Sequence, residues 1–386
     1  MLSWVLCVLV YAQARILVYQ PQALANELAM KYSSHEIPAS LATFGNPPYG
    51  TAMKGKVYKP KEEDTLACSH MDPITFSSDS ALVPFVLLER GQCTFVTKVR
   101  NAQRIGAAAV LIGNNDEEAS ERIVMADDGT GGDIFVPSFF ISKSDEDLLD
   151  SYIDPSSLEE VVLSLTFEIN TKDRVDYQFW TSSEHEVGRK FLHDFAPYAS
   201  LFSSVNAWMT PHYVLWYATE RQANDFTEPH EDCVSGGRYC APDPDDDQPL
   251  TGRHVVMEDL RELCVYQQTV AAGTQTLWWN YVQIFYERCS LQDFATETCS
   301  EEAMEEAGAS VDEVRNCVAS SFEGLDYELA DNTLLREERR LMTNSGAYYY
   351  PMMLINNQTY RGDLEAPEVF NAICTGMTVK PPVCIP

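Results

Sequence analysis

Eleven cysteines constrain this chain more than any other feature of its sequence. Cys7 lies in an apolar N-terminal segment, and the other ten form an even set, as expected for disulfides in an oxidising compartment. None of them forms a Cys-x-x-Cys pair, so the sequence excludes a zinc ribbon and a thioredoxin-type redox centre. The ten are Cys68, Cys93, Cys233, Cys240, Cys264, Cys289, Cys299, Cys317, Cys374 and Cys384.

The N-terminus has the form of a secretory signal peptide. The apolar run from Trp4 to Tyr11 is far shorter than the roughly 20 residues of a membrane span, and Ala12-Gln13-Ala14 after it is a signal-peptidase pattern. We therefore expect residues 1–14 to be removed. A buried N-terminal strand is the alternative, because the segment has no Lys or Arg before the apolar run. In a secretory lumen, the sequon at Asn357 would be a glycan acceptor.

The charge of the chain excludes one class of partner. It has 58 acidic and 27 basic residues, and its formal net charge is −31. A phosphate backbone would be repelled, so we expect no nucleic-acid partner. An acidic surface suits basic or neutral peptides, and more simply it keeps a protein soluble. We expect membrane association only through a transmembrane segment downstream of this chain, since no later stretch approaches the length of a span.

The hydropathy pattern from about residue 40 to residue 170 alternates between strands and helices. Continuous apolar runs predict buried strands, and apolar residues at helical spacing after the first run predict a helix. Such an order implies parallel strands joined by right-handed crossovers. The predicted strands are 82–88, 108–112, 135–141 and 161–169, and the predicted helices are 95–105 and 144–152.

A polar hinge at 170–174 marks the predicted start of a second domain, residues 171–386. Strand, helix and strand come first, and a hairpin and a closing helix come last. This is the thioredoxin plan with a helical insert at about 253–344, so both domains belong to the α/β class. The predicted strands are 175–180, 212–219, 348–356 and 358–361, and the predicted helices are 186–199, 253–271, 276–289, 292–307, 311–323 and one that begins at Pro367.

Short motifs in both domains form a family pattern. They are Phe44–Gly50 (FGNPPYG), the Arg-Gly-x-Cys-x-Phe turn at Arg90–Phe95, Lys98–Gln103 (KVRNAQ), Gly106–Val110 (GAAAV), Phe179–Ser182 (FWTS), Thr210–Tyr213 (TPHY), Gly237–Pro244 (GRYCAPDP), Trp278–Val282 (WWNYV) and Asn356–Gly362 (NNQTYRG). With these motifs, residues 15–170 resemble the protease-associated (PA) domain of the vacuolar sorting receptors of plants, most specifically in the 90–95 turn. Residues 171–386 resemble the central, thioredoxin-like domain of the same receptors.

The resemblance implies a binding protein and no enzyme. We expect the lumenal, cargo-binding region of a receptor in the ER, Golgi and prevacuolar compartments, which recognises sorting signals on soluble proteins bound for a vacuole. A soluble secreted PA-domain protein that binds peptides without a trafficking role is the alternative. In the family, two loops of the PA domain face the cargo. The expected cargo contacts are Arg90, Gly91, Gln92, Cys93, Thr94 and Phe95 in the first loop, and Met125, Ala126 and Asp127 in the second.

The sequence also departs from the plant receptors. Those receptors continue into epidermal-growth-factor-like modules, a transmembrane helix and a cytosolic tail, whereas this chain stops at Pro386. Val187 and Ala218 stand where relatives carry cysteine, and the segment 224–233 has fewer cysteines. Four cysteines are absent by this reading, which is the even number that loss of whole disulfides would give.

The residue types of the 90–95 turn suit a peptide site. Gly91 lets the backbone approach a ligand, and the guanidinium of Arg90 offers a forked donor to carboxylates or carbonyls. A helix that opens near Thr94 directs unpaired N–H groups outward. The alternative is a stabilising turn in which Arg90 pairs with a local carboxylate. Because Cys68 and Cys93 are the only cysteines of the first domain, we expect them to be bonded, whereas the eight later cysteines allow 105 pairings.

The sequence lacks the motifs of the enzymes and metal sites that we considered. The thioredoxin plan places its reactive cysteines at Ser183–Gly188, where none stands, and Pro351 takes the position of its cis-proline. The sequence has neither Gly-x-Ser-x-Gly nor His-Glu-x-x-His. The loop Asp127–Asp133 lacks the acidic alternation and the distal glutamate of an EF-hand. We expect no catalytic residue, metal or cofactor.

Overall fold

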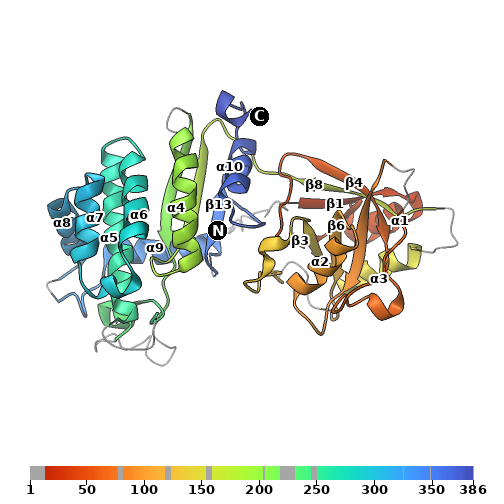
Figure 1. The fold of residues 1–386 in the computed structure, drawn as a ribbon, viewed down its shortest axis with the longest axis horizontal. Coiled ribbons are helices and arrows are strands. Elements are labelled where there is room, and N and C mark those ends of the chain that lie inside the picture. The colour runs from red at the N-terminus through yellow and green to blue at the C-terminus, as the bar shows by residue number, and fades with distance from the viewer. Residues whose placement is uncertain are drawn as a thin grey trace, which may run out of the picture. The chain divides into compact units, whose positions relative to one another are not determined.

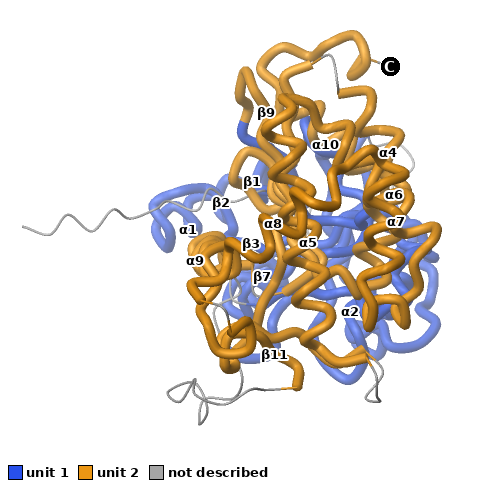
Figure 2. The backbone as a smooth tube through the Cα atoms, turned by 90° about the vertical axis from the view of Figure 1, so that its left-hand side faces the viewer, with its two compact units in different colours: residues 1–170, 360–364 blue, residues 171–359, 365–386 orange. Residues whose placement is uncertain are grey.

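A computed structural model gives the fold in two compact units (Figure 1). Residues 1–170 with 360–364 form the first unit, and residues 171–359 with 365–386 form the second (Figure 2). The predicted signal peptide lies outside the described residues except for Ala14. The structure describes residues 14–76, 81–117, 123–153, 159–202, 205–217, 231–244, 250–324, 326–347 and 349–385.

An eight-stranded sheet organises the first unit, in the order β2-β1-β8-β4-β5-β6-β7-β3. The four strands from β4 to β7 are parallel, and β8 runs antiparallel to β1 and β4. The elements are β1 (Ala14–Gln20), α1 (Gln22–Tyr32), β2 (Glu36–Ile37), β3 (Ala39–Leu41), β4 (Ala52–Tyr58), β5 (Val83–Glu89), α2 (Phe95–Arg104), β6 (Ala109–Gly113), β7 (Ser138–Ile141), α3 (Lys143–Tyr152) and β8 (Val162–Phe167).

Both faces of this sheet are covered by helices. Successive side chains of a strand point to opposite faces, so β5 contributes to a core on each face. From β5, Phe85 and Leu87 pack into one core with residues of α1 and α3. Val86 and Leu88 of the same strand pack into a second core with Val96 and other residues of α2. Because β5 is buried on both faces, its residues 85–88 are apolar without interruption, as we predicted from the sequence for a buried strand. The β5-α2-β6 crossover places the start of α2 at the carboxyl end of β5, where the predicted site lies.

Residues 360–364 belong to the first unit, although the sequence led us to place them in the second domain. The Gly362 N–H donates to the Ala42 carbonyl at 3.1 Å, and the hydroxyl of Tyr49 donates to the Arg361 carbonyl at 3.0 Å. Gly362 has φ +110°, and a Cβ there would lie 2.6 Å from Pro47 Cδ, so glycine is required. The end of the NNQTYRG motif, Tyr360–Gly362, thus contacts the FGNPPYG motif within the first unit.

The second unit has a thioredoxin-like sheet in the order β10-β9-β13-β14. Strands β9 and β10 are parallel, and β13 is antiparallel to β9 and β14. We expected the second strand at 212–219, but it begins at Ala207 and ends at Tyr213. Pro211 lies inside it, which an edge strand tolerates. The elements are β9 (Val175–Thr181), α4 (Glu186–Leu201), β10 (Ala207–Tyr213), β11 (Cys233–Val234), β12 (Tyr239–Cys240), β13 (Met352–Ile355), β14 (Gln358–Thr359) and α10 (Ala366–Thr375).

The predicted helical insert is present between β12 and β13. Four of its helices follow the predicted positions, but α9 was not foreseen as a separate helix. Asn332 caps α9 by accepting from the N–H groups of Leu334 and Leu335, and Leu335 and Met342 are buried one to two turns on. The insert helices are α5 (Gly252–Ala271), α6 (Thr276–Arg288), α7 (Thr298–Ala307), α8 (Val311–Ser321) and α9 (Thr333–Ser345).

All ten cysteines after Cys7 are disulfide-bonded. Cys68 and Cys93 are joined in the first unit, with Cα atoms 5.6 Å apart. Three of the four bonds of the second unit span ten residues or fewer, and Cys264–Cys317 spans 53 residues and joins α5 to α8. The four bonds are Cys233–Cys240, Cys264–Cys317, Cys289–Cys299 and Cys374–Cys384.

Candidate peptide-binding site

The turn between β5 and α2 has a backbone that exposes polar groups. Gly91 has φ +134° and Gln92 has φ +63°, so both residues adopt backbone conformations that L side chains rarely take. The Cys93 N–H closes the turn on the Gly91 carbonyl at 2.8 Å. Thr94 caps α2 by accepting from the Thr97 N–H at 3.2 Å. Gln92 and Thr94 are exposed, and Gly91, Cys93 and the side chain of Phe95 are half-buried.

A rigid backing lies behind this turn. The Cys68–Cys93 disulfide ties it to the segment before β5, and Lys98 of α2 donates to the Leu66 carbonyl in that segment. The Lys98 ammonium lies 3.6 Å from Cys68 Sγ, and the residue is fully buried. Burial lowers its pKa to about 8, because the charged form loses its hydration. Asn101 adds a hydrogen bond to the Ala67 carbonyl at 2.9 Å, so the turn has little freedom to move.

Arg90 is held from one side and exposed on the other. Its Nη1 donates to Asn114 Oδ1 at 2.8 Å and lies 3.7 Å from Asp116 Oδ2, and its guanidinium lies 5.9 Å from the ring centroid of Phe140. About a third of the side chain (32%) remains exposed. The local carboxylate that we considered as an alternative is thus present. At 3.7 Å this ion pair is too long for a good hydrogen bond, so the Arg90 guanidinium keeps N–H donors that a ligand can use.

The structure separates the three predicted residues of the second loop. Met125 is fully buried in the core on the α2 side of the sheet, so its side chain does not face a ligand. Ala126 and Asp127 are exposed. The Asp127 carboxylate accepts from the N–H groups of Gly129 and Gly131 at 3.0 and 2.9 Å. Met125 anchors this loop in the core, and the next two residues are exposed and stay predicted cargo contacts.

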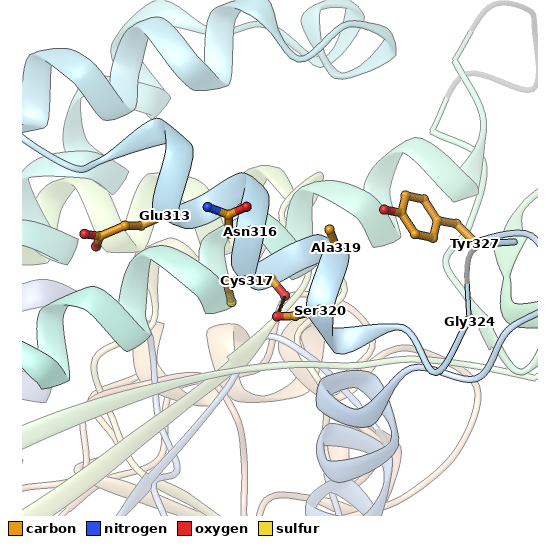
Figure 3. A pocket seen from close by; sticks show the side chains of 7 residues that line it. All are labelled: Glu313, Asn316, Cys317, Ala319, Ser320, Gly324 and Tyr327. Atoms are coloured by element: carbon orange, nitrogen blue, oxygen red, sulfur yellow. Dashed lines mark hydrogen bonds between the residues drawn. The ribbon is translucent and has the colours of Figure 1, made fainter.

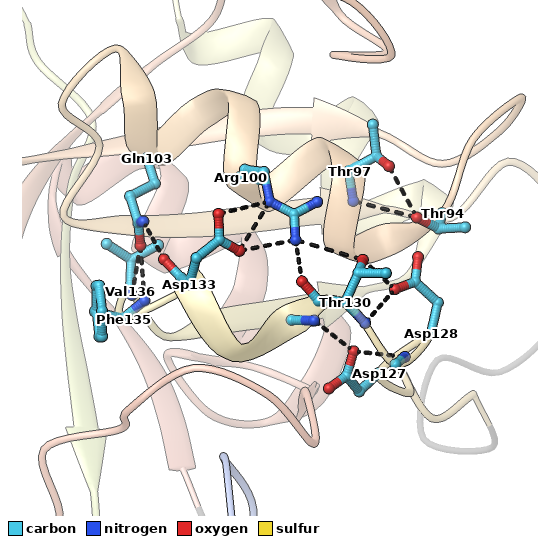
Figure 4. A network of polar contacts seen from close by, with 12 residues as sticks. Thr94, Thr97, Arg100, Gln103, Asp127, Asp128, Thr130, Asp133, Phe135 and Val136 are labelled. Atoms are coloured by element: carbon cyan, nitrogen blue, oxygen red, sulfur yellow. Dashed lines mark hydrogen bonds and ion pairs between the residues drawn. The ribbon is translucent and has the colours of Figure 1, made fainter.

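Helix α2 joins the two predicted loops (Figure 4). The Arg100 Nε donates to both oxygens of Asp133 at 2.8 and 2.9 Å, and its Nη2 donates to the Thr130 carbonyl. Gln103 accepts from the Phe135 N–H at 2.7 Å. At the start of the helix, hydrogen bonds from Thr130 and Thr94 lower the pKa of Asp128. One rigid element therefore positions both loops.

From the sequence we did not identify Arg100 and Gln103 as residues that position the loops. Both belong to the KVRNAQ motif, which we recognised only as part of the family pattern. The signal that could have found them is their spacing of three on one face of α2. Without the fold, nothing in the sequence indicates that the 127–136 segment lies against this face.

The acidic loop residues have protein partners of their own. Asp127 and Asp128 accept from N–H groups of their own loop, and Asp133 pairs with Arg100. Within the described ranges, no group of three or more His, Cys, Asp or Glu side chains is placed to hold a metal ion.

The thioredoxin-like unit has carboxylates where that fold would place its reactive cysteines. The Ser183 N–H donates to the Asp259 carboxylate of α5 at 2.8 Å, and Asp259 is fully buried. Burial first, and the nearby charge of Glu184 second, raise the pKa of Asp259 well above its usual range. Burial raises the pKa of the neighbouring Glu262 to about 8. The Tyr350–Pro351 peptide is cis, as the thioredoxin plan predicts.

Two other positions in the second unit were considered as sites. Asn357 is exposed in the tight turn between β13 and β14 and is sterically available to a glycan, so it stays a predicted acceptor. A hollow of about 600 Å³ lies on α8 and includes Cys317 and Tyr327 in its wall (Figure 3). Glu313 is the one charged side chain that lines it, so it offers little for recognition.

Comparison with known proteins decides the family. The sequence profile described as the vacuolar sorting receptor thioredoxin-like domain matches residues 175–374, just over half of the chain. The chain belongs to the vacuolar sorting receptor family. The profile of the PA domain matches residues 53–149. These matches confirm the family and the α/β fold class that the motifs indicated.

The full-length receptors of this family are longer than the chain. Vacuolar-sorting receptor 2 of Arabidopsis thaliana is 32% identical over 376 residues, which are 90% of this chain and 58% of the relative. Vacuolar-sorting receptor 1 of Pisum sativum is 32% identical over 372 residues, with the same coverage. The chain thus spans about 58% of the length of these curated relatives. Among the described residues, no helix combines the length and the apolar character that a membrane span requires.

Solved structures add no argument beyond these matches. The aminopeptidase from Aneurinibacillus sp. strain AM-1 is 15% identical and covers 44% of this chain and 38% of its own, with a TM-score of 0.26. Both sequence relatives described above carry the name of a receptor.

Proposed function

We propose that this chain is the cargo-binding region of a vacuolar sorting receptor, and that its first unit binds an extended peptide segment carrying a sorting signal. The relatives are named as vacuolar-sorting receptors, which supports a place in the secretory pathway on the route to a vacuole. The observation that carries the proposal is the joining of two exposed loops by α2.

The chemistry of the joined loops suits the main chain of a peptide. Arg90 offers guanidinium N–H groups, and the first N–H groups of α2 have no partner within the helix. Gln92 and Thr94 add exposed side chains that both donate and accept. On the other loop, the Asp127 carboxylate can accept a peptide N–H beside the two N–H groups that it already binds. The site thus offers both donors and acceptors, as an extended peptide requires.

Calorimetry with synthetic sorting-signal peptides tests this proposal on the whole chain. Replacement of Arg90 (Arg90→Ala) removes a charge-assisted hydrogen bond, and we expect affinity to fall about ten-fold or more, roughly 1.5–3 kcal/mol. Arg90→Lys should restore part of the loss, because an ammonium keeps the charge but not the planar fork.

Arg104→Ala is the matched control, since Arg104 is an exposed arginine in the last turn of α2. It makes the same change of charge away from the turn and should leave affinity unchanged. Circular dichroism shows whether each variant is folded. A folded Arg90→Ala variant that binds as tightly as the parent would make Arg90 a structural residue of the turn and remove the basis of the site.

A further inference from the structure

A hollow of about 390 Å³ in the second unit is lined by four arginines. Three of them come from one face of α9, at a helical spacing of three to four residues. The volume lies in the range of roughly 300–1,000 Å³ that small-ligand sites occupy. The lining residues are Tyr217, Arg238, Tyr239, Asp331, Arg336, Arg339, Arg340 and Thr343.

This charge is unusual in a chain with 58 acidic and 27 basic residues. Among the described residues that line the hollow, Asp331 is the one carboxylate. Arg336 pairs with Asp331 and Glu323, and Arg340 pairs with Glu337. The four guanidiniums and these three carboxylates sum to a formal charge of +1, in a chain whose formal net charge is −31.

Arg339 stands out within this set. Its Nη1 donates to the Leu215 carbonyl at 2.9 Å, and its guanidinium stacks on Tyr217 with Cζ 3.4 Å from the ring centroid. Its buried Nε has no hydrogen-bond partner among the described residues. Burial lowers its pKa, and the groups that oppose this shift are Tyr217 and Tyr239 rather than a carboxylate. A half-buried guanidinium held by a carbonyl and a ring keeps its charge available to a ligand.

We propose that this hollow is a binding site for the carboxylate side chains of an acidic peptide segment. The forked donors of arginine match carboxylates, and Tyr217 and Tyr239 place aromatic rings beside the charged groups. The site lies in the thioredoxin-like unit, so it is separate from the 90–95 turn and does not depend on the function proposed for that turn. Long-range repulsion by the acidic chain would oppose such a ligand, so binding requires these local contacts.

Calorimetry of the whole chain with acetylated hexaglutamate tests the site. We expect saturable binding of hexaglutamate and none of acetylated hexaglutamine, which has a similar shape and no charge. Arg339→Ala should weaken binding about ten-fold or more, and Arg339→Lys should restore part of it. Arg340→Ala, at a more exposed position, should also weaken binding, and it provides the test if Arg339→Ala fails to fold.

Arg288→Ala is the matched control, because Arg288 is an exposed arginine of α6 outside the hollow. It removes one positive charge and should leave hexaglutamate binding unchanged. The proposal is overturned if hexaglutamate does not bind, or if folded Arg339→Ala and Arg340→Ala variants bind it as tightly as the parent. Saturable binding of inorganic phosphate in place of hexaglutamate would also overturn the assignment to carboxylates.

Discussion

In the first unit β5 passes through a short turn into α2, and in the second unit β9 passes through a short turn into α4. Each helix is capped by a side chain, Thr94 in one and His185 in the other. The first turn is half-exposed and has the cationic groups of Arg90 and Lys98 around it. In the second turn Ser182 and Ser183 are buried beside a carboxylate, because the inserted helix α5 places Asp259 on the Ser183 N–H, while Glu184 and His185 are half-buried.

The difference shows that the same strand-to-helix turn can be open to a ligand or closed by a side chain of the protein. An N–H group at a strand-to-helix turn needs an acceptor. In the second unit a side chain of the insert supplies that acceptor, so the position is closed to ligands. In the first unit the backing of the turn consists of the disulfide and Lys98, which leave its outer side open. The open turn is therefore the better place for a peptide, and the closed turn is a structural centre whose stability depends on pH.

The largest expected effect concerns the closed turn. Glu262 has a pKa raised from 4.5 to about 8, because burial penalises its charged form. A raised pKa means that the folded state favours the protonated acid, so stability is full below pH 4.5 and is lost as pH rises toward 8. Between these two pH values, we expect the free energy of unfolding to fall by up to about 1.4 kcal/mol per pH unit. Glu262→Gln cannot ionise and should reduce this slope without abolishing it, because the buried Asp259 also has a raised pKa. Urea unfolding at several pH values measures the slope.

Glu302→Gln is the control for this prediction, because Glu302 is an exposed carboxylate of α7. It should leave the pH dependence as in the parent. An equal slope in Glu262→Gln and the parent would show that Glu262 is already charged in the folded state.

The next effect concerns the backing of the open turn. The double variant Cys68→Ser and Cys93→Ser removes a bond across 25 residues of sequence. The chain-entropy relation gives a loss of roughly 3 kcal/mol for a loop of this size. We expect a lower melting temperature and weaker peptide binding, since the turn loses its link to the segment before β5. Unchanged binding in the folded variant would show that the disulfide does not shape the site.

The smallest effect concerns the link between the two loops. Arg100→Ala removes the donors that hold Asp133 and the Thr130 carbonyl. Loss of this network should cost about 1 kcal/mol in unfolding free energy and weaken peptide binding less than Arg90→Ala does. Arg104→Ala on the same helix is the control. If Arg100→Ala affects stability but leaves peptide affinity unchanged, the 125–133 loop takes no part in binding.

The sequence predicted much of the fold after residue 81 because its signals there are local, whereas none of the elements before it, β1 to β4 and α1, was predicted. The buried runs of β5 and β6, the helical spacing of α2 and the turn residues at 90–95 each need only a few neighbours to be recognised. Three features required the fold. The core position of Met125, the return of residues 360–364 to the first unit and the closing of the second turn by Asp259 all join residues far apart in the chain.

Hydrogen–deuterium exchange, followed by mass spectrometry with and without a bound sorting-signal peptide, tests the contrast between the two turns most directly. We predict slower exchange of the amides of residues 91–97 and 126–131 when the peptide is bound, and unchanged exchange at residues 182–188. Slower exchange at 182–188 with no change at 91–97 would contradict the account, because the peptide would then bind at the turn that the insert closes.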